Sequence, residues 1–185
     1  DKLVTGVQTC ALPICERGAT VRVVSIAPPF TPESVADAYD AAVGPRTRLA
    51  VVDHITAETA LVLPLADIAR RLKARGVAVL VDGAHAPAGI PLDVPSLGVD
   101  YYVANLHKWA FVPRSSGFLW AAPERQPGLH PTVISWGLDQ GFTAEFDLVG
   151  TRDPSTHLAT PAALAFIEQL GGLDAVLADR KSTRL

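Results

Sequence analysis

The chain has 185 residues, of which 49% are hydrophobic and 19% are charged, and its formal net charge is −3. This composition is typical of one globular domain with its own core. The negative balance argues against nucleic acid as a partner, and no apolar run approaches the ~20 residues that a membrane-spanning helix needs. We therefore expect a cytoplasmic protein with neither a nucleic-acid nor a membrane partner.

The two ends of the chain differ in character from the rest. The stretch VTGVQTCALPI near the start and the stretch DRKSTRL at the end both resemble translated sequencing adapters. On this interpretation residues 1–14 and 179–185 are non-native segments, which are left out of fold reasoning. Residues 15–150 and 151–178 then form the native part. The alternative is a natural, poorly ordered tail at each end.

Strand and helix patterns alternate from residue 22 onward. Arg22–Ala27 is rich in β-branched residues and predicts a strand. A helix follows, with Thr31 as its N-cap, Pro32 in its first turn and Gly44-Pro45 beyond its end. Arg48–His54 is almost entirely apolar inside, which predicts a strand that is buried on both faces.

The alternation continues through the rest of the chain. Apolar residues at helical spacing predict a helix that ends at Gly76: Leu65, Ile68, Ala69 and Leu72. We expect further strands at Val77–Asp82, Tyr101–Leu106 and Gly117–Ala122, a helical turn in Asp93–Asp100, loops over Pro123–Gly150 and a helix from about Thr160 to Leu170. This order predicts an α/β fold with a largely parallel sheet flanked by helices.

Polar residues follow or precede several of these strands at what should be one edge of the sheet. They are Asp53-His54, Asp82 with His85, His107-Lys108, and Ser115-Ser116 before the last strand. Ligands of open α/β sheets bind beyond the carboxyl ends of the strands. The convergence of these residues therefore predicts a ligand site.

Each of these residues also has a structural interpretation. Asp82 suits a cation but also an Asx-turn or a helix cap, and Gly83 would let the chain turn close to a ligand. His85 would share that ligand, bind a metal or make one backbone hydrogen bond. Lys108, partly desolvated by apolar neighbours, would act as an amine nucleophile, or it would lie on the surface with its stem over Trp109.

Five stretches occur in order between residues 21 and 172: DHITAETALVLPL, VDGAHAPAGIPLD, DYYVANLHKW, SSGFLW and EFDLVGTRDPS. Together they resemble the class V aminotransferase family of pyridoxal-phosphate enzymes, and within it the isopenicillin N epimerase-like branch. The resemblance implies the later part of a fold type I large domain, truncated at both ends, with residues 151–178 leading to a small domain outside the chain. It also implies a homodimeric enzyme that epimerises or transaminates an amino-acid substrate and is inactive as this fragment.

The resemblance assigns catalytic and cofactor-binding roles to three residues. Lys108 would hold pyridoxal 5′-phosphate as a Schiff base and would move the proton on the substrate α-carbon. Asp82 would pair with the protonated ring nitrogen of the cofactor. His85 would lie near the ring and its 3′-oxygen.

Five further residues receive binding roles from the same resemblance. Asn105 and His107 would help to hold the cofactor phosphate. Thr56 would donate to the 3′-oxygen, a role that many relatives give to an asparagine one position further on. Thr151 would reach the phosphate of the neighbouring subunit, and Arg152 would meet a substrate carboxylate.

Other interpretations are also open. A metal-dependent hydrolase would give Lys108 no role. Its metal ligands would be an Asp/His cluster: Asp53, His54, Asp82, His85 and His107. A cysteine desulfurase-like lyase would use the same cofactor and the same lysine. A domain without its own activity is a further alternative.

Overall fold

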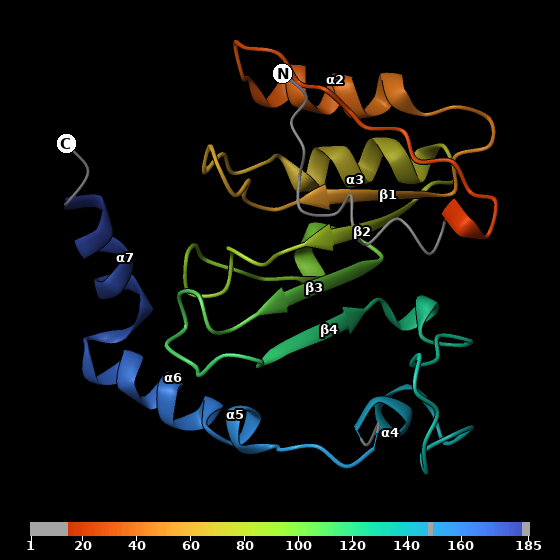
Figure 1. The fold of residues 1–185 in the computed structure, drawn as a ribbon. Coiled ribbons are helices and arrows are strands. Elements are labelled where there is room, and N and C mark those ends of the chain that lie inside the picture. The colour runs from red at the N-terminus through yellow and green to blue at the C-terminus, as the bar shows by residue number, and fades with distance from the viewer. Residues whose placement is uncertain (1–14, 148–149, 183–185) are drawn as a thin grey trace.

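The computed structural model describes residues 15–147 and 150–182. Its centre is a four-stranded sheet in the order β1-β2-β3-β4 (Figure 1). The first three strands run parallel and the fourth runs antiparallel to the third: β1 (Leu49–Asp53), β2 (Ala78–Asp82), β3 (Tyr101–Asn105) and β4 (Gly117–Ala121). The predicted α/β fold with a largely parallel sheet is confirmed.

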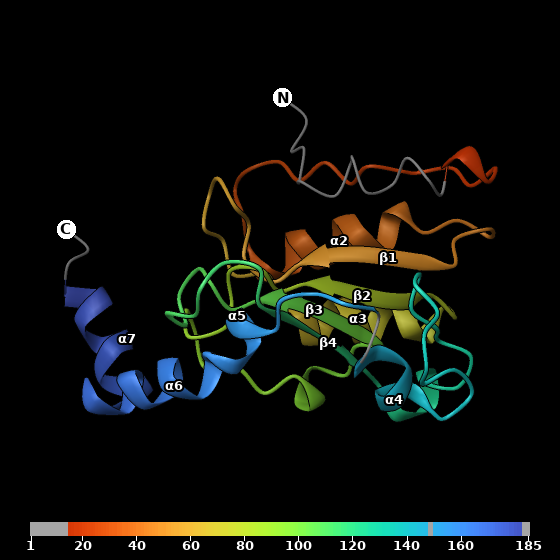
Figure 2. The same cartoon turned by 60° about the horizontal axis from the view of Figure 1, so that its bottom comes forward.

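Two helices lie near β1, one of them packed on a face of the sheet, and the later helices lie around the β4 end (Figures 1 and 2). The helices near β1 are α2 (Pro32–Ala42) and α3 (Leu65–Ala74), and two short 3₁₀ turns follow in the connections, η2 (Pro95–Leu97) and η3 (Pro123–Arg125). The later helices are α4 (Phe142–Asp147), α5 (Ser155–Leu158), α6 (Thr160–Gln169) and α7 (Gly172–Ser182). In Figure 1, α6 and α7 lie on the side toward which β1, β2 and β3 point, and α4 lies on the opposite side.

None of the helices in the described part of the chain is by itself long and apolar enough to cross a bilayer. The pair Ser155–Gln169 and Gly172–Asp179 reaches that length and composition together, with a bend of 69° between its two members.

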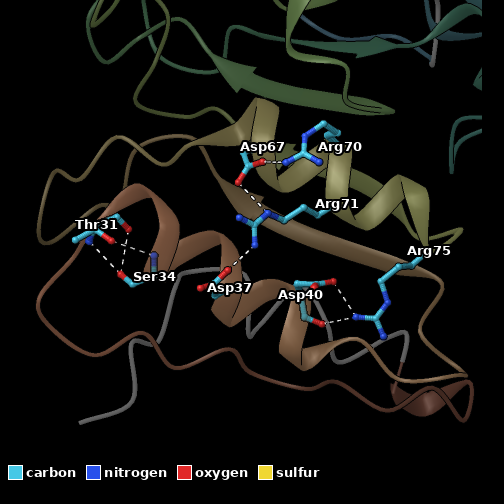
Figure 3. A network of polar contacts seen from close by, with 8 residues as sticks. All are labelled: Thr31, Ser34, Asp37, Asp40, Asp67, Arg70, Arg71 and Arg75. Carbon is cyan, nitrogen blue, oxygen red and sulfur yellow. Dashed lines mark hydrogen bonds and ion pairs between the residues drawn. The ribbon is translucent and has the colours of Figure 1, made fainter.

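The start of α2 and its contacts with α3 follow the sequence signals. The backbone N–H of Ser34 donates to Thr31 Oγ1 at 3.1 Å, so Thr31 is the N-cap, as predicted. Two ion pairs then join the helices (Figure 3): Arg71 to Asp37 at 2.5 Å and Arg75 to Asp40 at 2.8 Å. Exposed ion pairs contribute at most about 1 kcal/mol each, so the buried apolar faces carry most of the stability of this helix pair.

The sheet has one buried face and one open face among the described residues. Val52, Val79, Val81 and Tyr102 are fully buried in the cluster that contains the apolar face of α3. The residues that alternate with them are only partly buried, and Leu49 is exposed. The prediction that the β1 strand is buried on both faces is therefore wrong, because the residues on its second face are at most partly buried.

One further prediction differs from the structure. Arg22–Ala27 is not a strand, since its β-branched residues have no partner strand among the described residues and a strand forms only by pairing. The last predicted helix ends at Gln169, as expected, and α7 starts at Gly172. Residues 1–14 lie outside the described part, and the predicted segment boundaries stay predictions.

The fully buried side chain of Tyr102 in β3 packs against Gly83, the residue that follows β2. Its hydroxyl lies 2.8 Å from His54 Nδ1, and its ring stacks on Phe118 at 6.1 Å between centroids. A Cβ atom on Gly83 would lie 2.2 Å from two ring carbons of Tyr102. The structure thus gives Gly83 a packing reason, in addition to the ligand approach that we expected from the sequence.

We predict that Gly83→Ala lowers the free energy of unfolding by about 2–3 kcal/mol, because Tyr102 must shift to admit the methyl group. Urea unfolding at constant pH measures the change. Gly44→Ala is the matched control, since its Cβ would meet no neighbouring atom closer than 4.0 Å. Equal unfolding midpoints for the two variants would contradict the packing role of Gly83.

Candidate functional site

The parallel strands deliver their polar ends to one edge of the sheet. Asp53 pairs with Asp82, and Asp82 pairs with Val103, in the register of β1, β2 and β3. Because β4 is antiparallel, it starts at this same edge, where Gly117 pairs with Asn105. The four polar stretches singled out in the sequence therefore leave from or enter one edge.

Asp82 combines the structural and the functional interpretation. Its Oδ1 accepts a hydrogen bond from the backbone N–H of Ala84 at 3.0 Å, which is the turn role considered above. This bond uses one of the two carboxylate oxygens and holds the side chain at the strand end. The described residues offer no hydrogen bond to Oδ2, so this oxygen can accept from a ligand.

Lys108 and His85 are in direct contact. Lys108 Nζ lies 3.0 Å from His85 Nε2. Burial and then the charge of Lys108 lower the pKa of His85, while the charge of Asp82 acts in the opposite direction. A neutral imidazole accepts a hydrogen bond from an ammonium group at this nitrogen. His85 therefore contacts the Lys108 amine and senses the charge of the Asp82 carboxylate.

The surroundings of Lys108 differ from the prediction. We expected its neighbours to desolvate the amine, but Lys108 is exposed and Trp109 is 43% exposed. The buried part of this loop comes just after them, where Ala110 and Val112 form a cluster with Ala163 of α6. Helix α6 thus holds the loop, while the amine itself stays accessible.

Three polar atoms near this edge are buried without a partner among the described residues: Asn105 Oδ1, His107 Nδ1 and Ser116 Oγ. Buried polar atoms in native proteins nearly always have a hydrogen-bond partner, so these three point to a polar ligand. A Ser116 hydroxyl and a protonated His107 Nδ1 can both donate to an anion, and a rotated Asn105 amide offers its nitrogen. This donor set fits a phosphate group.

Ser116 was singled out only as a polar residue before a strand, and we did not assign it a role. Its backbone oxygen accepts from Leu106 N–H at 3.0 Å, which holds it beside the end of β3. The sequence signal that could have identified Ser116 is its position directly before Gly117. Gly117 starts the strand that pairs with the residues before Lys108.

The loops at this edge carry backbone strain. Four non-glycine residues in them have positive φ angles: Ala60 (52°), Ala88 (55°), Phe111 (59°) and Ser115 (76°). Each such conformation costs about 1–3 kcal/mol and persists only where surrounding contacts enforce it. For Phe111, one of these contacts is an edge-to-face packing on Phe166 of α6 at 5.3 Å. Strain of this kind clusters at functional sites.

Three predicted binding residues are not joined to this constellation by any described contact. The Thr56 hydroxyl closes its own turn, lying 2.6 Å from Thr59 Oγ1 and accepting from Leu61 N–H at 2.8 Å. Thr151 and Arg152 are exposed on the connection that leads to α5. Their roles toward the cofactor, the neighbouring subunit and the substrate stay predictions.

The predicted metal ligands are not gathered either. His54 contacts Tyr102 on one face of the sheet, whereas Asp53 points with Asp82 to the other face. Burial lowers the pKa of His54, which keeps it neutral. Within residues 15–147 and 150–182, no three His, Cys, Asp or Glu side chains form a group that could hold a metal ion.

Comparison with known proteins places the chain in one family. Residues 6–180 match the family model described as aminotransferase class-V. Isopenicillin N epimerase of Streptomyces clavuligerus is 37% identical in an alignment of length 159 that covers 77% of this chain and 40% of that protein. A probable chloroplastic L-cysteine desulfhydrase of Arabidopsis thaliana is 37% identical over 138 residues, 72% of this chain and 29% of that protein.

Solved structures show the same fold. The cystine C-S lyase C-DES, in complex with its product cysteine persulfide, aligns with a TM-score of 0.78 and 27% identity over 94% of this chain and 50% of that chain. A C-DES variant with glycine covalently linked to the pyridoxal-phosphate cofactor aligns with a TM-score of 0.66 and 28% identity, over 75% of this chain and 40% of that one. The chain thus spans half or less of each of these proteins. Since the family model covers nearly all of its residues, the chain belongs to the class V aminotransferase family.

Proposed function

We propose that the protein carrying this sequence is a pyridoxal-phosphate enzyme that acts at the α-carbon of an amino acid. The observation that carries the proposal is the 3.0 Å contact between Lys108 and His85 at the edge where Asp82 ends β2. An amine, an imidazole and a carboxylate converge there, beside three buried polar atoms that suit a phosphate. Membership of the class V family supports the same assignment.

Lys108, His85 and Asp82 would have different roles in this chemistry. When bound, pyridoxal phosphate supplies an electron sink for the bond that breaks at the α-carbon. Lys108 would hold the cofactor through its side-chain amine, and the same amine would move the α-proton of the substrate. His85, 3.0 Å from Lys108 Nζ, would orient the amine through a hydrogen bond. The Asp82 carboxylate would pair with the ring nitrogen and favour its protonated form.

The remaining polar residues bind and orient. Asn105, His107 and Ser116 would hold the phosphate, because each has a buried polar atom without a protein partner. Thr151 and Arg152, which are exposed in this chain, would act across a homodimer interface and on a substrate carboxylate. Thr56 would act on the 3′-oxygen only if Thr59 supplies the hydrogen of their shared bond, which leaves the Thr56 hydroxyl hydrogen free.

Two reactions are supported by relatives of equal identity. Epimerisation removes the α-proton and returns it on the other face, as the name of the Streptomyces relative indicates. Elimination also starts by removing that proton but expels the β-substituent, as expected for a cysteine desulfhydrase. Lys108 serves both reactions in the same way, so we propose the shared first step for this protein. The expected inactivity of the 185-residue piece alone stays a prediction.

We predict that Lys108→Ala removes the covalent attachment of pyridoxal phosphate after borohydride reduction, because this amine alone forms the bond. Mass spectrometry of the digested protein measures the label, which should fall to background. Lys73→Arg is the control, since it replaces a lysine on α3 that lies 3.7 Å from Asp100 and keeps the positive charge. A label that persists on another residue of the Lys108→Ala variant would refute the assignment.

We predict that Asp82→Ala retains the borohydride-trapped label but slows exchange of the substrate α-proton by roughly 100-fold, because the ring nitrogen loses its counter-charge. Proton NMR in heavy water measures this exchange for each amino acid that the wild-type protein processes. Asp93→Asn is the control, because Asp93 is an exposed carboxylate in a different loop. Unchanged exchange in a folded Asp82→Ala protein would remove Asp82 from the mechanism.

A further inference from the structure

Asp53 is an acidic residue that the proposed function does not use. It ends β1 as Asp82 ends β2, and the two residues are directly paired in the parallel register. Paired residues of neighbouring strands point to the same face of a sheet, and the strands lie about 4.8 Å apart. The two partly buried carboxyl groups are therefore neighbours on the face opposite Tyr102.

No cation in the described chain compensates this pair directly. The influences that act on the Asp53 carboxyl are burial and the charge of Asp82. Tyr39 of α2 also senses Asp53, since burial and then that charge raise the pKa of its phenol to about 12. On the Asp82 side, the neighbouring titratable groups are Tyr102 and His85, and only His85 is linked to a cation, Lys108. Two adjacent carboxylates without a cation of their own repel each other, and a positively charged ligand group relieves that repulsion.

We propose that Asp53 is a positioning residue of the cofactor site, which acts through Asp82 to set the negative charge that the ring nitrogen of the cofactor meets. This inference rests on the proposed function, because it takes Asp82 as the partner of that nitrogen. With Asp53 protonated, Asp82 alone provides one negative charge. With Asp53 ionised, a second negative charge stands beside it and holds the proton on the ring nitrogen to higher pH.

The titration of Asp53 falls in a range where this difference matters. Burial, followed by the charge of Asp82, raises the pKa of Asp53 from 3.8 to about 6. A carboxyl group whose pKa is raised by folding stabilises the folded state fully below about pH 4, and this contribution is lost as the pH rises through about 6. Replacing Asp53 with an uncharged isostere should therefore favour the folded state progressively from pH 4 to pH 7.

The first test uses the ligand-free protein. We expect the unfolding midpoint of Asp53→Asn to rise relative to that of wild type between pH 4 and pH 7, whereas the exposed control Asp93→Asn follows wild type. In an Asp82→Asn background, the effect of Asp53→Asn should become smaller and should level off at lower pH, because the neighbouring charge no longer raises the pKa of Asp53 in the folded state. Parallel pH profiles for all variants would show that the two carboxyl groups are not coupled and would overturn the inference.

The second test reads the cofactor directly. With ¹⁵N-labelled pyridoxal phosphate bound, the ring-nitrogen NMR shift reports its protonation as a function of pH. We expect Asp53→Asn to lower the midpoint of this transition by about one pH unit and Asp53→Glu to restore it, because the glutamate returns the charge.

The outcomes separate the two proposals. Bound cofactor with an unchanged nitrogen titration in Asp53→Asn overturns the role of Asp53 and leaves the proposed function standing. Failure of the wild-type protein to bind pyridoxal phosphate overturns both.

Discussion

The in-register parallel pairing of β1 with β2 is the constraint on which the rest of this structure depends. It places Asp53 opposite Asp82 and sends the loops after both strands out from the same edge. The pairing of β2 with β3 adds the loop that carries Lys108, and the antiparallel β4 returns to this edge next to Asn105. A shift of one residue in any of these registers would turn the acidic side chains toward the buried face. The geometry of the site is thus a direct consequence of strand pairing.

The two faces of the sheet have separate tasks because side chains alternate along each strand. One face packs Val52, Val79, Val81 and Tyr102 against α3, and there the hydroxyl of Tyr102 and the ring of His54 satisfy each other. The other face holds the pair of carboxyl groups. Since Gly83 lies directly after Asp82 and against the ring of Tyr102, the buried face positions the turn that presents the acidic residue. Packing and chemistry are linked at this single residue.

The loop that carries Lys108 is held in place by contacts with α6, whereas the Lys108 side chain is exposed. Phe111 and Ser115 have backbone angles that cost energy, and α6 holds the loop through Phe166 and Ala163. The amine remains exposed and, among the described polar groups, contacts His85. The proposed attachment of the cofactor to Lys108 would use this accessible position.

Several features could be predicted from the sequence, since each depends on local pattern and on the alternation of apolar residues. They are the order of strands and helices, the caps at Thr31 and Gly76, and the polar residues at the strand ends. The family resemblance was also visible in the sequence, because five motifs in order carry it.

Several features required the tertiary structure. Arg22–Ala27 has no partner strand among the described residues, and the second face of β1 is only partly buried, which no local propensity reveals. The pairing of Asp53 with Asp82, the separation of His54 from both, and the unpartnered Ser116 hydroxyl depend on register between distant segments. Local chemistry therefore determined which residues were available, and strand pairing decided which of them meet.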